Sequence, residues 1–408
     1  MFDTPLNALA IDPYCGGSHQ AFLDNIGSLS RHHWHFFRGD ARFWKWRMRS
    51  YPLSLVEEQL TAFRDASCDT NEVQLRIPDG MMVTSMLDLP SYRGLLASKA
   101  ADIHLTAQER DHCHHLLHVP TAIYFHENQI TYPISPNARE DSHYGYTNIL
   151  SAIVADEIWF NSEFHRTDFL TAANEFIRRM PDQRKAHPLE CLDQKSHVIY
   201  PGFRPQSPIA SMKDQSQHAL RVNRSSKQPI CIGWVARWEY DKRPDRFLEL
   251  LRIITKQKID FELVLLGARG KSCETLSEIE QEFQERIRYS GHAESSGEYN
   301  HFLNSLDIVV STADHEYFGI AMCEAISAGA VPVLPAKLSY PELAEPEFLY
   351  ATLNEAADLI SRLTDPETRC RLASQCRSQI EHLTVENCVL KLDQRFENMV
   401  KTHSKLKR

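Results

Sequence analysis

The stretch between residues 306 and 334 constrains the fold of this chain more than any other part of it. Two apolar runs, Leu306–Ser311 and Ala330–Leu334, have the composition of buried strands. Between them, Gly319–Ala328 has the pattern of a helix, and Gly329 follows in a position where helices commonly end. The stretch therefore predicts a strand, a loop, a helix and a second strand in succession.

Two glutamates mark the chemistry of this stretch. Glu316 lies in the predicted loop and Glu324 lies inside the predicted helix, with seven residues between them. The start of a helix presents free backbone N–H groups and the positive end of the helix dipole, which suits a phosphate. Carboxylates near that point can accept hydrogen bonds from sugar hydroxyls. The pattern therefore predicts a site for a nucleotide-sugar.

The length of the chain predicts two domains. A chain of 408 residues is too long for one ordinary hydrophobic core, and strand-like runs alternate with helical patterns along most of it. A stretch rich in Ser, Gln, Pro and Arg interrupts this alternation and has the composition of a linker. We predict an N-terminal α/β domain over 1–204, a linker over 205–228, a C-terminal α/β nucleotide-sugar domain over 229–380, and an amphipathic helix with a basic tail over 381–408.

Composition excludes several classes of protein. The net charge is −9, and residues 1–200 contain 18 Lys and Arg against 25 Asp and Glu, which argues against a broad non-specific nucleic-acid surface. The sequence has neither an apolar run long enough to span a bilayer nor a signal-peptide pattern at Met1–Pro5. Its ten cysteines are scattered, which is typical of reduced thiols. We therefore expect a cytoplasmic protein.

Two places offer groups that could meet a diphosphate. Gly16 and Gly17 follow the predicted strand Leu6–Ile11 and precede a helix, which is typical of phosphate-approaching loops, although a tight turn would explain them equally well. Arg237 and Lys242 follow the first strand of the second domain, where two cations could bind a diphosphate. The alternative for these cations is a solvated loop of ion pairs.

Polar and aromatic side chains gather at two places in the first domain. His126–Pro133 follows the predicted strand Thr121–Phe125, and ligands of open α/β sheets bind beyond the ends of the strands. Cations alternate with aromatic rings over Arg42–Arg49, which suits a nucleic-acid strand, with a surface loop whose tryptophans pack on the domain as the alternative. His114 and His118 have the spacing of a zinc pair, but a solvated histidine cluster explains them better because no further ligands accompany them.

These residues together resemble a known family. The Gly-Gly loop, Arg237 with Lys242, and Glu316-x7-Glu324 resemble retaining family-4-type glycosyltransferases of the GT-B fold. The first half is similar to a narrower group, the queuosine-tRNA mannosyltransferases. The segments that carry this resemblance are Tyr14–His19, Trp44–Arg49, Ser85–Leu89, His126–Pro133, Tyr144–Tyr146 and Phe160–Ser162.

The resemblance implies a fold and a donor. The fold would be two Rossmann-like domains with parallel sheets that face a central cleft, and a C-terminal helix that crosses back to the first domain. The donor would be GDP-mannose, with no catalytic metal and no other cofactor. Catalytic roles would fall to Glu316, His126, Arg237 and Lys242. The donor-binding residues would be Gly16, Gly17, Arg237, Lys242, Glu316, Phe318, Gly319, Ile320 and Glu324.

The resemblance also implies an acceptor, the cyclopentenediol of queuosine in the anticodon of tRNA-Asp. The first domain would bind this tRNA. Together with the aromatic-basic pattern, this points to a set of acceptor-binding residues: Arg42, Trp44, Lys45, Trp46, Arg47, Arg49, Asn128, Gln129 and Tyr132. No membrane partner is expected, and the oligomeric state stays open.

Two alternatives remain. One is an enzyme of the same fold with a different sugar donor, or with a non-RNA acceptor such as a lipid, for which we expect a basic amphipathic docking helix that the sequence does not show. The other is a non-catalytic module that binds a nucleotide or RNA. The presence of Arg237, Lys242, Glu316 and Glu324 together speaks against this second alternative.

Overall fold

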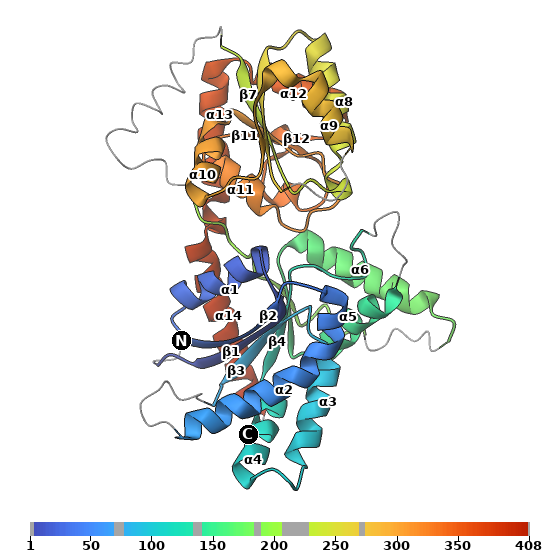
Figure 1. Ribbon diagram of the computed structural model, residues 1–408, viewed down its shortest axis with the longest axis vertical. Coiled ribbons are helices and arrows are strands. Elements are labelled where there is room, and N and C mark those ends of the chain that lie inside the picture. The colour runs from blue at the N-terminus through green and yellow to red at the C-terminus, as the bar shows by residue number, and fades with distance from the viewer. Residues whose placement is uncertain are drawn as a thin grey trace. The chain divides into compact units, whose positions relative to one another are not determined.

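A computed structural model of the chain describes residues 4–68, 77–133, 141–182, 189–205, 228–268 and 274–406. It divides into two compact units (Figure 1). Unit 1 comprises Met1–Pro201 and Glu386–Arg408, and unit 2 comprises Gly202–Val385. The linker expected at 205–228 falls almost entirely outside the described residues. Within those residues, no helix is both long and apolar enough to cross a membrane.

Unit 1 contains a six-stranded parallel sheet in the order β2-β1-β3-β4-β5-β6. Its strands are β1 (Asn7–Cys15), β2 (His33–Asp40), β3 (Gly80–Thr84), β4 (Thr121–Phe125), β5 (Glu157–Phe160) and β6 (Ser196–Val198). Its helices are α1 (Ser18–Leu29), α2 (Trp44–Cys68), α3 (Leu89–Ala100), α4 (Ala107–His118), α5 (Ser142–Val154), α6 (Glu163–Arg179) and α14 (Val385–Leu406).

The alternation of side chains along the strands of unit 1 divides its core between two faces. Leu9, Val83 and Phe125 point to one face and pack with helices α2 to α6 in one hydrophobic cluster. On the other face, Phe22 of α1 stacks on Tyr124 of β4 with ring centroids 4.3 Å apart. Because every residue of β3, β4 and β5 is buried, these strands read as continuous apolar runs in the sequence.

Helix α14 returns the end of the chain to unit 1. Asp393 accepts hydrogen bonds from Ser30 Oγ at 2.6 Å and from the Arg31 backbone N–H at 2.9 Å. Arg395 donates to both carboxylate oxygens of Glu157 in β5, at 2.7 and 2.5 Å. The crossing C-terminal helix expected from the sequence is thus confirmed.

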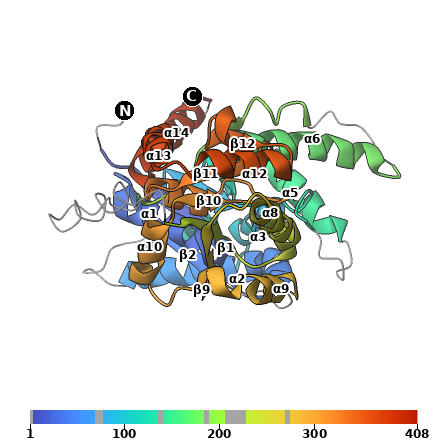
Figure 2. The same ribbon diagram turned by 90° about the horizontal axis from the view of Figure 1, so that it is seen from above.

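Unit 2 contains a second six-stranded parallel sheet, in the order β12-β11-β10-β7-β8-β9. Helices α8, α9 and α12 group on one side of it, and α10 and α13 on the other (Figures 1 and 2). The strands are β7 (Ile230–Val235), β8 (Phe261–Leu266), β9 (Ile287–Gly291), β10 (Ile308–Val310), β11 (Val331–Pro335) and β12 (Leu349–Tyr350). The helices are α8 (Pro244–Lys256), α9 (Glu274–Glu282), α10 (Ser296–Ser305), α11 (Ile320–Ser327), α12 (Leu353–Arg362) and α13 (Pro366–Ile380).

Two features of unit 1 depart from the sequence-based reading. Strand β1 continues through Asp12–Cys15, where we expected the loop to begin. The alternative of a surface loop over Arg42–Arg49 is wrong, because helix α2 begins at Trp44 and runs for 25 residues. Both differences extend regular structure into polar or aromatic sequence. Strand β1 keeps its pairing with β2 as far as Cys15, and the inner face of α2 joins the core cluster.

Candidate active site

The loop between β10 and α11 is fixed by a glycine and a serine. Gly319 has φ 96°, a left-handed conformation that side chains rarely adopt, and it caps the start of α11. Ser339 Oγ donates hydrogen bonds to the backbone oxygens of Phe318 at 3.0 Å and Glu316 at 3.3 Å. The loop therefore presents the N-terminus of α11, with its first backbone N–H groups and positive dipole end, in a defined orientation.

Lys242 joins the end of β7 to this loop. It lies in a short 3-10 turn, Tyr240–Lys242, and is 9% exposed. Its ammonium group donates to the His315 backbone oxygen at 2.7 Å and to Glu316 Oε2 at 3.3 Å, and Asp241 Oδ2 lies 3.2 Å away. The structure thus brings together two of the predicted donor-site residues, Lys242 and Glu316.

The charge states of this cluster follow from its contacts. Burial works to raise the pKa of Glu316, but Lys242 and other neighbours outweigh burial and lower the pKa below its ordinary value. For Lys242, burial works to lower the pKa, but Glu316 and Asp241 raise it. Both groups are therefore charged at neutral pH. Burial and the Lys242 ammonium lower the pKa of His315 to about 4, so that imidazole is neutral.

Glu324 lies one turn into α11 and has a partner that the sequence analysis missed. The Tyr299 hydroxyl of α10 donates to Glu324 Oε2 at 2.8 Å. Burial raises the pKa of Glu324. Tyr299 therefore holds one carboxylate oxygen of Glu324 in place. A tyrosine in the preceding helix carries no sequence signal for such a contact, because the two residues are 25 positions apart.

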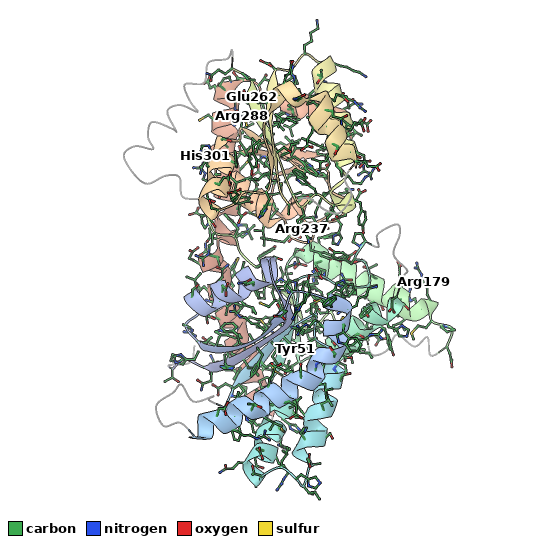
Figure 3. All side chains as sticks on the ribbon, viewed as in Figure 1. Tyr51, Arg179, Arg237, Glu262, Arg288 and His301 are labelled. Atoms are coloured by element: carbon green, nitrogen blue, oxygen red, sulfur yellow. The ribbon has the colours of Figure 1, made fainter. Side chains whose placement is uncertain are left out.

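Arg237 is more exposed than Lys242. Its side chain is 64% exposed, and its guanidinium lies 3.9 Å from Glu239 (Figure 3). Its charge reaches the cluster, since it adds to the main effects of burial and Lys242 in lowering the pKa of His315. The solvated ion pair that we considered as the alternative thus exists for Arg237, whereas Lys242 is buried in the cluster.

The glycines of the β1–α1 turn are required by the backbone. Gly17 has φ 55°, and a Cβ at Gly16 would lie 2.4 Å from Ala41 Cβ. The turn therefore explains Gly17, and the close approach of Ala41 explains Gly16. Their contact with a donor diphosphate stays a prediction.

Asp12 of β1, His19 of α1 and His126, which directly follows β4, lie together, with Asp12 and His19 buried and His126 partly buried. Asp12 Oδ2 lies 3.0 Å from His19 Nδ1, and Asp12 Oδ1 accepts from Thr84 Oγ1 at 3.0 Å. The His19 ring stacks on that of His126 with centroids 3.9 Å apart. Burial, followed by His19, lowers the pKa of His126 well below its ordinary value, so that imidazole is neutral at neutral pH. Of these three residues, only His126 was predicted from the sequence as a site residue.

The loop that follows β4 is held from within by Asn128. This residue is 0% exposed, and its Oδ1 accepts from the backbone N–H groups of Ile130 and Thr131, both at 3.0 Å. Asn148 of α5 accepts from the Gln129 N–H at 2.8 Å. The structure therefore gives Asn128 a role in shaping the loop, in place of the acceptor contact we predicted. Gln129 and Tyr132 are partly exposed, and acceptor contacts for them stay predictions.

The predicted acceptor residues of the Arg42–Arg49 run surround the start of α2. Trp44 packs on Tyr144 of α5 with ring centroids 5.1 Å apart, and Lys45 and Arg49 lie over the Tyr144 ring at 5.6 and 4.7 Å. Arg42 and Arg47 pair with Asp40 at 2.8 and 3.0 Å. The Trp46 side chain is 69% exposed.

The histidine cluster of α4 forms no metal site in the described part of the chain, where no group of three potential ligands is placed to bind a metal. His118 Nδ1 lies 2.8 Å from the His114 backbone oxygen, as expected for a helix end. His114 and His118 are both exposed.

Comparison with known proteins gives the family. Residues 7–203 match the family described as tRNA-queuosine alpha-mannosyltransferase N-terminal, and residues 192–379 match glycosyl transferases group 1. The chain is 31% identical over 349 residues to the tRNA-queuosine alpha-mannosyltransferase of Drosophila melanogaster. The aligned region covers 85% of this chain and 84% of that protein.

Solved structures share the fold. The structural match to Anabaena Alr3699/HepE in complex with UDP covers 96% of this chain and 100% of that one, with a TM-score of 0.63 and 16% identity. The match to sucrose-phosphate synthase from Thermosynechococcus elongatus covers 97% of this chain and 100% of that one, with a TM-score of 0.63 and 15% identity. These likenesses show the GT-B fold alone. The family is shown by the sequence match across both units: this glycosyltransferase belongs to the tRNA-queuosine alpha-mannosyltransferase family.

Proposed function

We propose that the chain transfers mannose from GDP-mannose to a hydroxyl of the queuosine cyclopentenediol in tRNA-Asp, with retention at the sugar carbon. The observation that carries the transfer step is the Lys242–Glu316 contact beside the start of α11. This contact joins a buried cation to a carboxylate that can accept hydrogen bonds from sugar hydroxyls. The name of the Drosophila relative supports the acceptor and the sugar. The reaction belongs in the cytoplasm in this proposal.

The bond changes in this proposal involve only donor and acceptor. The bond between the sugar C1 and the diphosphate oxygen breaks, and the departing GDP takes the electron pair. The acceptor oxygen forms a bond to C1 from the same face, and its proton passes to an oxygen of the departing diphosphate. The step needs neither a protein nucleophile nor a metal. What the protein supplies is charge stabilisation and orientation.

Three features of unit 2 suit the growing negative charge on the diphosphate. Lys242 and Arg237 are cations near the end of β7, and the N-terminus of α11 adds oriented N–H groups. Lys242 already forms ion pairs with Glu316 and Asp241, so its position is fixed before the donor binds. A preorganised cation loses little free energy to reorganisation during the reaction.

Glu316 and Glu324 serve the two sugars of the donor in this proposal. Glu316 is ionised at neutral pH and accepts hydrogen bonds from hydroxyls of the transferred sugar. Glu324, with one oxygen held by Tyr299, offers its other oxygen to the ribose. In this proposal the backbone at Phe318, Gly319 and Ile320, at the start of α11, contacts the phosphates and the sugar.

A donor panel tests the enzymatic half of the proposal. Purified protein is incubated with labelled GDP-mannose, GDP-glucose or UDP-glucose and queuosine-containing tRNA, with and without EDTA. We expect transfer from GDP-mannose, unaffected by EDTA. Transfer from UDP-glucose alone would overturn the donor assignment.

The Glu316→Gln variant separates catalysis from RNA binding. It removes the charge beside Lys242 and weakens the sugar-hydroxyl contacts, so we expect transfer to fall at least 100-fold, about 2.7 kcal/mol of transition-state stabilisation. Binding of tRNA, measured by filter retention, should stay within twofold. Equal loss of tRNA binding would show that Glu316 belongs to the acceptor site or to the fold.

A further inference from the structure

The start of α2 presents two aromatic rings to solvent. Phe43 is 77% exposed and Trp46 is 69% exposed. Among the described residues, the exposed large hydrophobic side chains include one other aromatic, Tyr240. Exposed neighbouring rings leave apolar surface in water, and such patches commonly mark binding surfaces.

The backbone fixes Phe43 in this exposed position. Its φ is 51°, in the left-handed region that favours glycine, and its carbonyl accepts from the N–H groups of Trp46 at 2.9 Å and Arg47 at 3.0 Å. A bulky residue in a strained conformation with an exposed side chain contributes little to the core. Strain of this kind at an exposed residue is a reason to look for a function.

The inner face of the same helix accounts for its stability. Met48, Tyr51 and Leu55 are 0%, 3% and 0% exposed, and Tyr51 is labelled in Figure 3. Trp44 packs against Tyr144. Phe43 and Trp46 are separate from these contacts. Phe43 directly precedes the helix and Trp46 lies in its first turn, where the Trp46 N–H donates to the Phe43 carbonyl, so both side chains belong to the same turn at the start of α2.

Charges around the two rings fit RNA. The exposed cations Arg42, Lys45 and Arg49 flank them, so a base could stack on each ring while a cation meets the adjoining phosphate. The patch also holds Asp40, 61% exposed, which pairs with Arg42 and Arg47.

An anionic membrane fits this surface less well. The exposed face of α2 continues with Leu53 and then with Glu57 and Glu58, so the basic and aromatic character is confined to the first turns of the helix. Helices that bind membranes carry a long apolar stripe with Lys and Arg beside it. A short patch of two rings matches a few unpaired nucleotides better.

We propose that Phe43 and Trp46 form a two-ring stacking platform for unpaired nucleobases of the acceptor RNA. Phe43 is the new member of the acceptor site, and the platform binds bases through their faces, without reading their edges. The identity of the RNA as the tRNA anticodon loop rests on the proposed function.

Binding of labelled anticodon stem-loops to the full chain, without donor, tests the platform. The variants are Phe43→Ala, Phe43→Gly and Trp46→Ala, with Leu53→Ala as the matched control for an exposed apolar side chain on the same helix. Each ring variant should weaken binding about tenfold, because stacking on a base contributes on that order. The slope of affinity against salt should stay unchanged, because no charge is removed. Leu53→Ala should bind as the wild type does.

The Phe43→Gly variant distinguishes a loss of RNA affinity from a loss of folding stability. Glycine adopts the left-handed conformation of residue 43 freely, so Phe43→Gly should show a denaturation midpoint no lower than that of the wild type while it loses RNA affinity. Wild-type RNA affinity in all three ring variants would overturn the inference. So would unchanged RNA affinity together with loss of binding to phosphatidylserine vesicles, which would assign the patch to a membrane.

The outcomes also separate this inference from the proposed function. Stem-loops with and without queuosine are both tested, and the ring variants should weaken both to the same degree. If the ring variants bind RNA more weakly and the wild type transfers no mannose, the platform is supported and the proposed function is wrong. Normal transfer with unaffected binding in the ring variants would remove the platform alone.

Discussion

Lys242 holds together the loop that precedes α11, because its buried ammonium contacts Glu316, Asp241 and the His315 backbone oxygen at once. A buried charge is stable only when it is paired and hydrogen-bonded. The same contacts keep Glu316 ionised and ready to accept hydrogen bonds. One residue therefore sets both the shape and the charge of the loop that precedes α11.

The Tyr299→Phe variant tests how Glu324 is held. It deletes the hydroxyl that donates to Glu324 Oε2 and leaves the ring in place. We expect the donor KM to rise several-fold, about 1 kcal/mol, with kcat little changed, because the contact orients a binding group. Tyr289→Phe, which deletes a bond to the His292 backbone at an exposed site, is the control in steady-state kinetics. A fall in kcat at constant KM would instead assign Glu324 to the chemical step.

His112 gives a pH prediction for stability. Burial lowers its pKa to about 4, so the folded protein keeps it neutral where the unfolded chain, with a pKa of about 6.5, binds a proton. The contribution of neutral His112 to the free energy of unfolding is fully present above about pH 6.5 and is lost as pH falls towards 4.

We expect His112→Phe to reduce the acid loss of unfolding free energy between pH 6.5 and 4 by up to about 3 kcal/mol, measured by urea denaturation. The ring would keep its stacking on Phe63, whose centroid lies 4.4 Å away. His104→Gln, at an exposed position, controls for the loss of one histidine. An unchanged acid profile in His112→Phe would show that His112 is protonated in the folded protein.

At the residue scale, the sequence predicted Lys242 and Glu316 because each lies beside a strand end within a recognisable pattern. It could not predict Tyr299, Asp12 or His19, because their roles depend on contacts between different elements. Asn128 shows the reverse case. Its polar side chain suggested an exposed contact, yet its own loop uses that side chain.

Among the elements, the β10–loop–α11–β11 unit was predicted most closely. Apolar strand runs and a helix stop at Gly329 gave its order, and the observed helix Ile320–Ser327 lies within the predicted Gly319–Ala328. Strand β2 was missed, because its exposed histidines and arginine hide the alternating pattern that its position at the sheet edge allows. Strand order likewise depends on contacts that the sequence does not encode locally.

Helix α14 carries a stability prediction. Arg395 pairs with both oxygens of Glu157, which is 7% exposed, so Arg395→Ala would leave a nearly buried carboxylate without this partner. We expect a loss of about 2 kcal/mol of unfolding free energy in chemical denaturation. Arg179→Ala, labelled in Figure 3, removes an exposed pair with Glu175 and should cost less than about 0.5 kcal/mol. Equal effects of the two substitutions would show that α14 contributes little to unit 1.

For the whole molecule, each unit brings a different part of the proposed reaction. Unit 2 holds the Lys242–Glu316 cluster and Glu324, which suit a nucleotide-sugar. Unit 1 holds the His126 loop and the exposed start of α2, which suit an RNA acceptor. The family relationship spans both units, since the match to the Drosophila relative covers 85% of the chain.

Nucleoside mass spectrometry of the reacted tRNA shows which nucleoside, if any, receives the sugar. Queuosine-containing tRNA-Asp and the same tRNA with guanosine at that position are incubated with the protein and GDP-mannose, then digested to nucleosides. We expect queuosine to gain one hexose and the guanosine tRNA to gain none. Unmodified queuosine, or a hexose on any other nucleoside, would contradict the proposed function.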